Sequence, residues 1–124
     1  MELVVTLPIP DACLSPNSRT HWAKLAKQKK QHREWSRIAA IDAMNTARFG
    51  KPWPGAVVRA VFFHKVKRGR DGDNAIAMLK SYFDGIADAG VVNNDKSFLH
   101  TSPEFMIDKA DPRVEIHLKR LEVS

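Results

Sequence analysis

Residues 56–66 read Ala-Val-Val-Arg-Ala-Val-Phe-Phe-His-Lys-Val, and this run of β-branched and aromatic side chains predicts the strongest β-strand of the sequence. A basic loop over residues 67–70 follows, and then a predicted helix over about residues 74–89. We expect Gly90 to close this helix, because glycine is common just past a helix C-terminus. Apolar residues recur three and four positions apart and predict one buried helix face: Ile76, Leu79, Phe83 and Ile86.

The segments on either side of this strand and helix complete the predicted fold. Residues 2–7 are expected to form a strand, and about residues 21–47 a long helix. Two further strands are predicted, near 98–107 and 113–121. This order favours the α+β class, with a single domain over residues 1–124 in which two main helices pack on one mixed sheet.

Composition restricts the class of protein. The chain has 124 residues and a formal net charge of +6, a length that suits one domain. No apolar run approaches the ~20 residues of a membrane span, and the first ten residues lack the pattern of a secretory signal peptide. The single Cys13 excludes an intramolecular disulfide and suits a reducing compartment. We therefore expect a cytoplasmic protein that does not associate with membranes.

The charges are unevenly distributed along the chain. Residues 1–70 contain 14 Lys and Arg against 4 acidic residues, whereas residues 71–95 contain Lys80 against five aspartates. Residues 96–124 contain five of each sign. A basic N-terminal part suits a polyanionic partner, and an acidic centre suits a metal ion.

The sequence Arg-Asp-Gly-Asp-Asn at residues 70–74 connects the basic loop to the predicted helix. One interpretation is turn and helix-cap chemistry, and the other is a pair of functional carboxylates on a loop. Seven residues make nearly two full helical turns, so a continuous helix would align Asp73 with Lys80, Asp84 and Asp88. Asp95 follows in a polar turn and would approach the same end of the sheet if the chain returns along it.

Carboxylates that converge from separate segments repel one another, and a bound cation is the usual means of neutralising them. Oxygen ligands suit Mg²⁺, with Mn²⁺ as a second possibility. The basic residues before the acidic pair are expected to bind phosphate: Lys65, Lys67, Arg68 and Arg70. These features together predict metal-assisted hydrolysis of a phosphodiester, in which the metal polarises the phosphate and lowers the pKa of the attacking water.

The first predicted helix is strongly basic. Its middle, residues 27–33, has no apolar side chain and is expected either to project into solvent or to break the helix. Two interpretations of the charge remain open, a solvated helix face and contact with the DNA backbone. The candidate DNA-binding residues here are Arg19, Lys24, Lys27, Lys29, Lys30 and Arg33. Trp22 and Trp35 are expected to anchor the core, and Trp53, between two prolines, to be more exposed.

These motifs resemble the RusA-type Holliday junction resolvases over most of the chain. The resemblance implies a RusA-like fold and a homodimeric, Mg²⁺-dependent endodeoxyribonuclease that nicks four-way or other branched DNA symmetrically in recombination and repair, often of phage or prophage origin. It also implies that Asp71, Asp73 and Asp95 bind the metal as catalytic aspartates, and that Lys80 is a catalytic lysine acting on the phosphate. The residues that carry it are Leu7-Pro8, Asn17, His21-Trp22, Arg70-Asp71-x-Asp73-Asn74, Lys80, Asp84-Gly85, Ala89-Gly90 and Asp95.

Two differences from the family pattern leave alternatives open. Asn94 precedes Asp95 where the family usually has a second aspartate, and the interval from Asp73 to Lys80 is longer by about one turn. The second hypothesis is therefore a non-catalytic protein that binds branched DNA, and the third is a basic structural protein with ordinary turns. For a homodimer, the two candidate surfaces are the strand 56–66 and the helix that contains Phe83.

Overall fold

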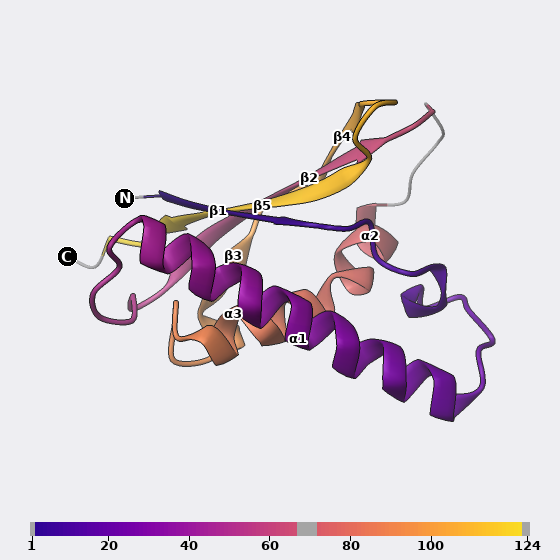
Figure 1. The fold of residues 1–124 in the computed structure, drawn as a ribbon, viewed down its shortest axis with the longest axis horizontal. Helices are drawn as coiled ribbons and strands as arrows, with labels where there is room; N and C mark the ends of the chain where they lie inside the picture. The colour runs from indigo at the N-terminus through magenta and orange to yellow at the C-terminus, as the bar shows by residue number, and fades with distance from the viewer. Residues whose placement is uncertain (1, 67–71, 123–124) are drawn as a thin grey trace.

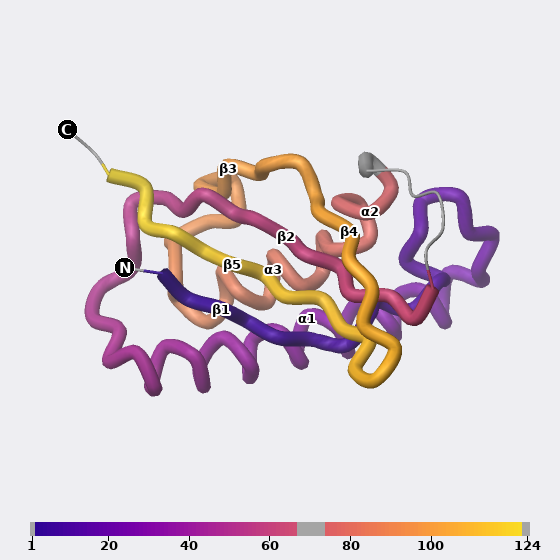
Figure 2. The backbone as a smooth tube through the Cα atoms, turned by 90° about the horizontal axis from the view of Figure 1, so that it is seen from above, coloured from indigo at the N-terminus to yellow at the C-terminus, as the bar shows by residue number. Residues whose placement is uncertain are grey.

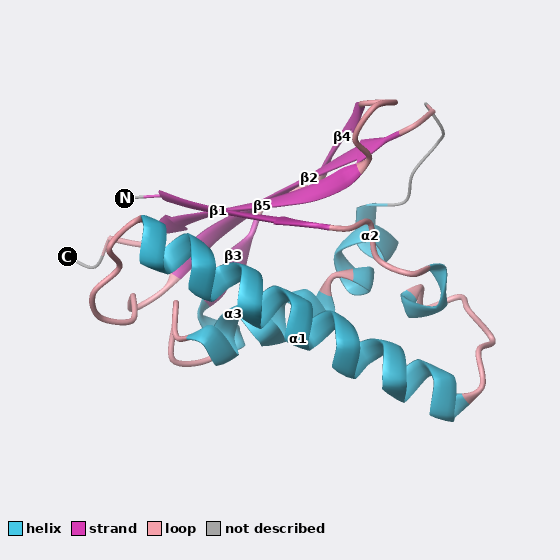
Figure 3. Ribbon diagram, viewed as in Figure 1, coloured by secondary structure: helices cyan, strands magenta, loops and turns pink. Residues whose placement is uncertain are grey.

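A computed structural model describes residues 2–66 and 72–122, with the backbone alone described for Asp73. These residues form an α+β domain in which one mixed sheet carries helices on one face (Figures 1 and 3). The predicted fold class is thus confirmed. The elements are β1 (Glu2–Leu7), α1 (Trp22–Thr46), β2 (Ala56–His64), α2 (Gly72–Met78), α3 (Lys80–Ala89), β3 (Phe98–His100), β4 (Glu104–Ile107) and β5 (Arg113–Arg120), with short 3-10 turns η1 (Ala12–Leu14) and η2 (Asp95–Ser97).

The sheet has the order β1-β5-β2-β3, and β4 also pairs with β2 (Figure 2). β1, β5 and β2 are antiparallel neighbours, whereas β3 and β4 run parallel to β2. The predicted strand 98–107 is therefore two short strands, and the register to β2 shifts by one residue between them. Thr101 spans the interruption, because its backbone N–H and its hydroxyl both donate to the carbonyl of Val58.

Strict alternation of side chains directs one face of the sheet into the core. Alternate residues of the antiparallel strands are almost completely buried beneath α1 and α3, and their neighbours face away from the helices. The removal of each such side chain from water is worth ~1.5–3 kcal/mol. The buried set includes Leu3, Val5 and Leu7 of β1 and Val114, Ile116 and Leu118 of β5.

The helix predicted over 74–89 is broken. α2 ends at Met78 and α3 begins at Lys80, because Leu79 between them has φ −91° and ψ 1° and its N–H bonds to the carbonyl of Ile76. Leu79 is itself completely buried, so core packing holds the break in place. The expected stripe that aligned Asp73 with Lys80 is therefore wrong, since the two residues lie on different helices.

The long basic helix is continuous. α1 runs through the apolar-free middle, and its N-terminal turns extend beyond the sheet (Figure 1). The Nδ1 atom of His21 caps this end by accepting the N–H of Ala23. His32 is buried and connects α1 to the preceding loop, since its Nδ1 lies 2.7 Å from the carbonyl of Gln28 and its Nε2 accepts the N–H of Asp11.

α1 and α3 approach each other most closely at Gly85. A Cβ atom built on Gly85 would lie 1.9 Å from Oγ of Ser36 and 2.1 Å from the carbonyl oxygen of Arg33. The hydrogen of glycine is therefore required for the two helices to pack at this distance. Tyr82, one turn earlier, donates its hydroxyl to the carbonyl of Pro8 at 2.8 Å and fixes α3 to the end of β1.

The expected positions of the tryptophans are reversed. Trp22 is 76% exposed because it lies on the projecting end of α1, and Trp35 is 37% exposed. Trp53 is buried instead. Its backbone N–H donates to the carbonyl of Val91, and its ring contacts that of Phe49. None of the helices in the described part of the chain is long and apolar enough to cross a bilayer.

The two elements predicted to form a homodimer surface, the strand 56–66 and the helix that contains Phe83, are partly used within the fold of one chain. β2 is an inner strand, with β5 on one side and β3 and β4 on the other, so its backbone hydrogen bonds are made within the sheet. Phe83 is 3% exposed and contacts the rings of Phe98 and His100. A dimer contact through either element would therefore use its exposed residues, such as Arg59 of β2 or Lys80 of α3.

Candidate functional site

Lys80 is the centre of a charged cluster that joins two segments of the chain. Its Nζ donates to Oδ1 of Asp84 at 2.7 Å and also to Oδ2 of Asp95. Asp84 lies one turn after Lys80 on α3, whereas Asp95 begins η2. We call these three residues the Lys80 cluster. Two carboxylates from separate segments thus share one ammonium group.

The connection after α3 brings Asp95 to Lys80. Gly90 ends α3 in the left-handed conformation, with φ +98°, and Val91 and Val92 then enter the core. The Oδ1 atom of Asn94 accepts the N–H of Lys96 and caps η2. The side-chain amide of Asn94 therefore orders the turn that holds Asp95.

Hydrogen bonding within the Lys80 cluster favours its charged forms. The bonds to Asp84 and then to Asp95 raise the pKa of Lys80 above its usual value. The bond from Lys80 lowers the pKa of Asp95. Nearby, His100 lies with its ring 4.5 Å from that of Phe83, and burial lowers its pKa. Lys80 and Asp95 are therefore charged at neutral pH, and His100 is biased towards its neutral form.

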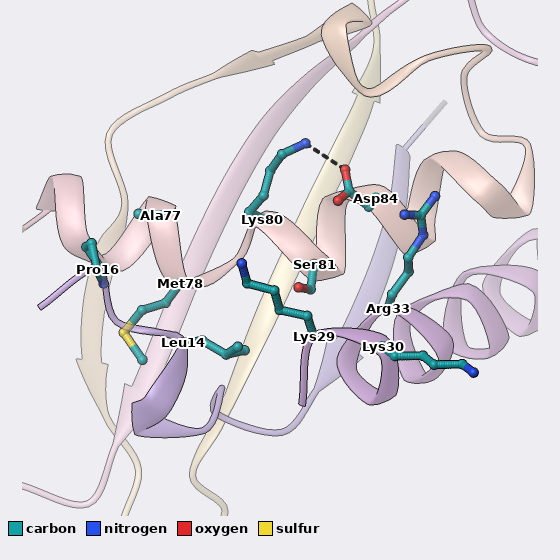
Figure 4. Close-up of a pocket in the computed structure, with 10 residues that line it drawn as sticks. All are labelled: Leu14, Pro16, Lys29, Lys30, Arg33, Ala77, Met78, Lys80, Ser81 and Asp84. Carbon is teal, nitrogen blue, oxygen red and sulfur yellow. Dashed lines mark hydrogen bonds and ion pairs between the residues drawn. The ribbon is translucent and has the colours of Figure 1, made fainter. Parts of the chain in front are cut away.

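A groove of about 620 Å³ lies between α1 and the junction of α2 with α3 (Figure 4). We call it the basic groove, because four of its lining residues are cationic: Lys29, Lys30, Arg33 and Lys80. Lys29 extends from α1 towards the helix junction, while Lys30 points away from it (Figure 4). A smaller hollow of about 170 Å³ shares Arg33 and Asp84 with the groove and reaches Asp95. The Lys80 cluster thus borders a surface on which a phosphate can find several donors.

Arg33, one of the predicted DNA contacts, is engaged within the chain. Its Nε lies 2.5 Å and its Nη2 2.8 Å from the two carboxylate oxygens of Asp88, a bidentate pair between α1 and α3. This pair raises the pKa of Arg33 further and lowers that of Asp88. Arg33 therefore contributes to helix packing, and its charge is largely compensated by Asp88.

We expect the Asp88→Ala variant to bind duplex DNA a few-fold more tightly than the wild type, because the variant releases the guanidinium of Arg33. The slope of log affinity against log salt concentration is expected to steepen by about 0.9, the contribution of one added phosphate contact. Fluorescence anisotropy over a salt series measures both quantities. Asp42→Ala is the matched control, since Asp42 is an exposed carboxylate of α1, the helix that carries Arg33, and forms no side-chain ion pair with any described residue. If Asp88→Ala and Asp42→Ala change the DNA affinity and its salt dependence equally, the cause is net charge alone.

The structure places some of the predicted site residues and not others. Arg19, Lys24 and Lys27 are exposed at or before the projecting end of α1. The side chain of Asp73 is not described, although its backbone lies in the first turn of α2. The remaining predicted residues lie outside the described residues: Lys67, Arg68, Arg70 and Asp71.

The predicted metal site depends on the two aspartates whose side chains are not described. Within residues 2–66 and 72–122, no group of three His, Cys, Asp or Glu side chains is arranged to hold a metal. Asp84 and Asp95 present carboxylate oxygens, which suit Mg²⁺, but Lys80 is bonded to both. Asp71 and Asp73 would have to supply the remaining ligands.

The sequence aligned Lys80 with Asp84 on one helix face, but it predicted no contact between Lys80 and Asp95. The signal for that contact was present in two features, a glycine that ends α3 and an asparagine that caps the following turn. Together these two residues turn the chain back, so that Asp95 reaches Lys80 shortly after α3 ends. The exposure of Trp22 was also missed, because it depends on how far α1 extends past its neighbours.

No protein-family model matches the chain. An uncharacterized protein of Xylella fastidiosa (strain Temecula1) is 35% identical to this chain over 97 residues. The matched region covers 77% of this chain and 63% of the relative, so the chain spans less than two thirds of the relative's length.

Proposed function

We propose that the protein is a Mg²⁺-dependent endodeoxyribonuclease that nicks four-way or other branched DNA, and that it acts in the cytoplasm as a homodimer. The observation that carries the proposal is the Lys80 cluster at the edge of the basic groove. A lysine that bridges Asp84 and Asp95, next to Lys29, combines groups for phosphate binding with groups for metal binding. The resemblance to RusA-type resolvases supports the same reaction.

The residues have distinct roles in this proposal. Asp71, Asp73 and Asp95 hold the Mg²⁺, which when bound polarises the phosphate and activates water. Lys29 and Lys30 bind the DNA backbone along the groove. Lys80 is directed to the scissile phosphate by Asp84, and its ammonium group stabilises the charge that develops on the phosphate oxygens. A dimer with two-fold symmetry matches the near two-fold symmetry of a four-way junction.

One observation favours a second function, a protein that binds branched DNA without cutting it. Lys80 neutralises Asp84 and Asp95 within the chain, so these carboxylates are compensated without a cation. In that case the basic groove would bind DNA with a strong salt dependence and no requirement for a divalent ion. Only the first function predicts a rate of junction nicking that removal of Lys80 would reduce.

The Lys80→Ala variant separates these functions. We expect the wild type to nick a synthetic four-way junction with Mg²⁺ and not with EDTA, and Lys80→Ala to nick it about 100-fold more slowly, as when one charge-stabilising donor is lost. Loss of the ammonium group also frees two carboxylates, so we expect Mn²⁺ affinity to rise about fivefold, equivalent to ~1 kcal/mol for one exposed charge. Gel assays measure the first quantity and titration calorimetry the second.

Lys96→Ala is the control for this experiment, because Lys96 is an exposed lysine adjacent to Asp95. It removes the same charge without freeing the Lys80 cluster and is expected to change both quantities less than twofold. A wild type that binds the junction without ever nicking it would refute the enzyme and support the binding protein. A wild type that binds no branched DNA at low salt would refute both.

A further inference from the structure

Trp22 is a large aromatic side chain that the fold leaves in solvent. It is the first residue of α1 and is 76% exposed, far more than Trp35 or Trp53. Among the described residues, the ring of Trp22 contacts only the ring of His21, at 5.5 Å between centroids. Because the core does not use this ring, packing within the chain does not explain its presence.

The surroundings of Trp22 carry charge of a single sign. Residues 12–33 contain no Asp or Glu, and their six basic residues are all exposed. Arg19 and Lys24 lie close to Trp22 in the sequence, and Lys29 lies two turns further along the same face of α1. A positive field of this kind selects a polyanion over an acid-poor or apolar protein partner.

Trp22 continues one wall of the basic groove. Positions 22, 29 and 33 are seven and four residues apart, so they share one face of α1. Lys29 and Arg33 line the groove on that face. Trp22 lies ~10 Å further along the helix axis than Lys29, a distance set by the rise of 1.5 Å per residue. A chain that follows the groove towards the projecting end of α1 therefore reaches the ring.

We propose that Trp22 is a stacking platform for an unpaired base of a nucleic-acid strand whose phosphates lie in the basic groove at Lys29. The inference rests on the proposed function insofar as it takes nucleic acid as the partner. An aromatic face stacks on any base that is not already stacked in a duplex. Branched DNA with a single-stranded segment presents such bases, so the ring adds selectivity that the lysines lack, because they contact only the backbone.

A membrane surface is the main alternative partner for a basic segment with a tryptophan. An interfacial helix requires a continuous apolar face, however, and Lys29 and Arg33 interrupt the face that carries Trp22. The opposite sides of the projecting turns carry Lys24 and Lys27. The pattern therefore favours a partner with phosphates and exposed rings over one with an acyl interior.

The test compares a short single-stranded oligonucleotide with a duplex of the same sequence, using anisotropy for affinity and intrinsic fluorescence for stacking. We expect Trp22→Ala to weaken single-strand binding about tenfold and duplex binding less than twofold. Trp22→Phe should retain most of the affinity, because the phenyl ring also stacks, and it should lose most of the fluorescence quenching that the single strand causes. Ile38→Ala is the matched control, since Ile38 is an exposed apolar residue of the same helix.

Each outcome bears on a different hypothesis. If the wild type binds a four-way junction but neither oligonucleotide, this inference alone is overturned; if it binds no branched DNA either, the proposed function fails with it. If both are bound but Trp22→Ala has no more effect than Ile38→Ala, this inference alone is overturned. An equal loss for single strand and duplex would also overturn it, because stacking on unpaired bases predicts a difference. Trp22-dependent binding to phosphatidylserine vesicles, without a preference for the single strand, would assign the ring to a membrane surface instead.

Discussion

Gly85→Ala is expected to destabilise the protein by about 3 kcal/mol, near the upper end of the cost of overpacking. Alanine usually stabilises a helix relative to glycine by ~1 kcal/mol, so a loss of stability would identify packing as the cause. The added methyl group would lie 1.9 Å from Oγ of Ser36 and 2.1 Å from the carbonyl oxygen of Arg33. A backbone carbonyl cannot rotate away, so α1 and α3 would have to separate. Thermal unfolding should show a fall in Tm of roughly 10 °C.

Two further variants make this expectation specific. Gly50→Ala is the control, because a Cβ at Gly50 meets no atom within 4 Å; its Tm should change little. The double variant Gly85→Ala/Ser36→Ala removes the hydroxyl but keeps the clash with the carbonyl of Arg33, so it should remain destabilised. A Tm for Gly85→Ala at or above that of the wild type would show that the helices do not cross as described.

Asp73→Asn is expected to reduce the rate of junction nicking by about 1,000-fold, equivalent to ~4 kcal/mol of transition-state stabilisation. The substitution replaces one of the three proposed metal ligands with a neutral group of the same size. Binding of the uncut junction should be unchanged or tighter, because a negative charge that repels phosphate is removed. Single-turnover cleavage and anisotropy measure the two effects separately.

The control for this variant is Asp42→Asn, an exposed carboxylate of α1 that the proposal does not use. It should nick at the wild-type rate. Mg²⁺ titration gives a further check, since a ligand loss should raise the Mg²⁺ concentration needed for half-maximal activity. If Asp73→Asn nicks as fast as the wild type, the assignment of Asp73 to the metal is wrong.

Local patterns predicted most of the fold. The residue types of 2–7 and 113–121 predicted the strands β1 and β5, and the two-residue period of a strand explains why alternate side chains of each are buried. The break at Leu79 was not predictable in this way. The apolar spacing on its two sides fits one continuous helix, and the break is fixed by burial against distant elements. The interruption between β3 and β4 likewise depends on the register with β2.

The candidate site was predictable in composition but not in arrangement. Lys80 and Asp95 were singled out by residue type, yet their ion pair connects positions far apart in the chain and depends on the turn after Gly90. The exposure of Trp22 and the burial of Trp53 also depend on tertiary structure. A tryptophan next to apolar residues resembles a core anchor until the length by which α1 projects is known.

Because α1 is unbroken, the distance between Trp22 and the Lys80 cluster is fixed. The helix is held to α3 at its crossing with Gly85, and it continues from there to Trp22 without a hinge. Deleting one residue between Trp22 and Lys29 would turn the ring by ~100° away from the groove. Deleting four would return the ring to within ~40° of its direction but shorten the reach by ~6 Å, about two base steps of B-form DNA. If a strand lies in the basic groove with one base stacked on Trp22, the same number of nucleotides would therefore always separate that base from the phosphate at Lys80.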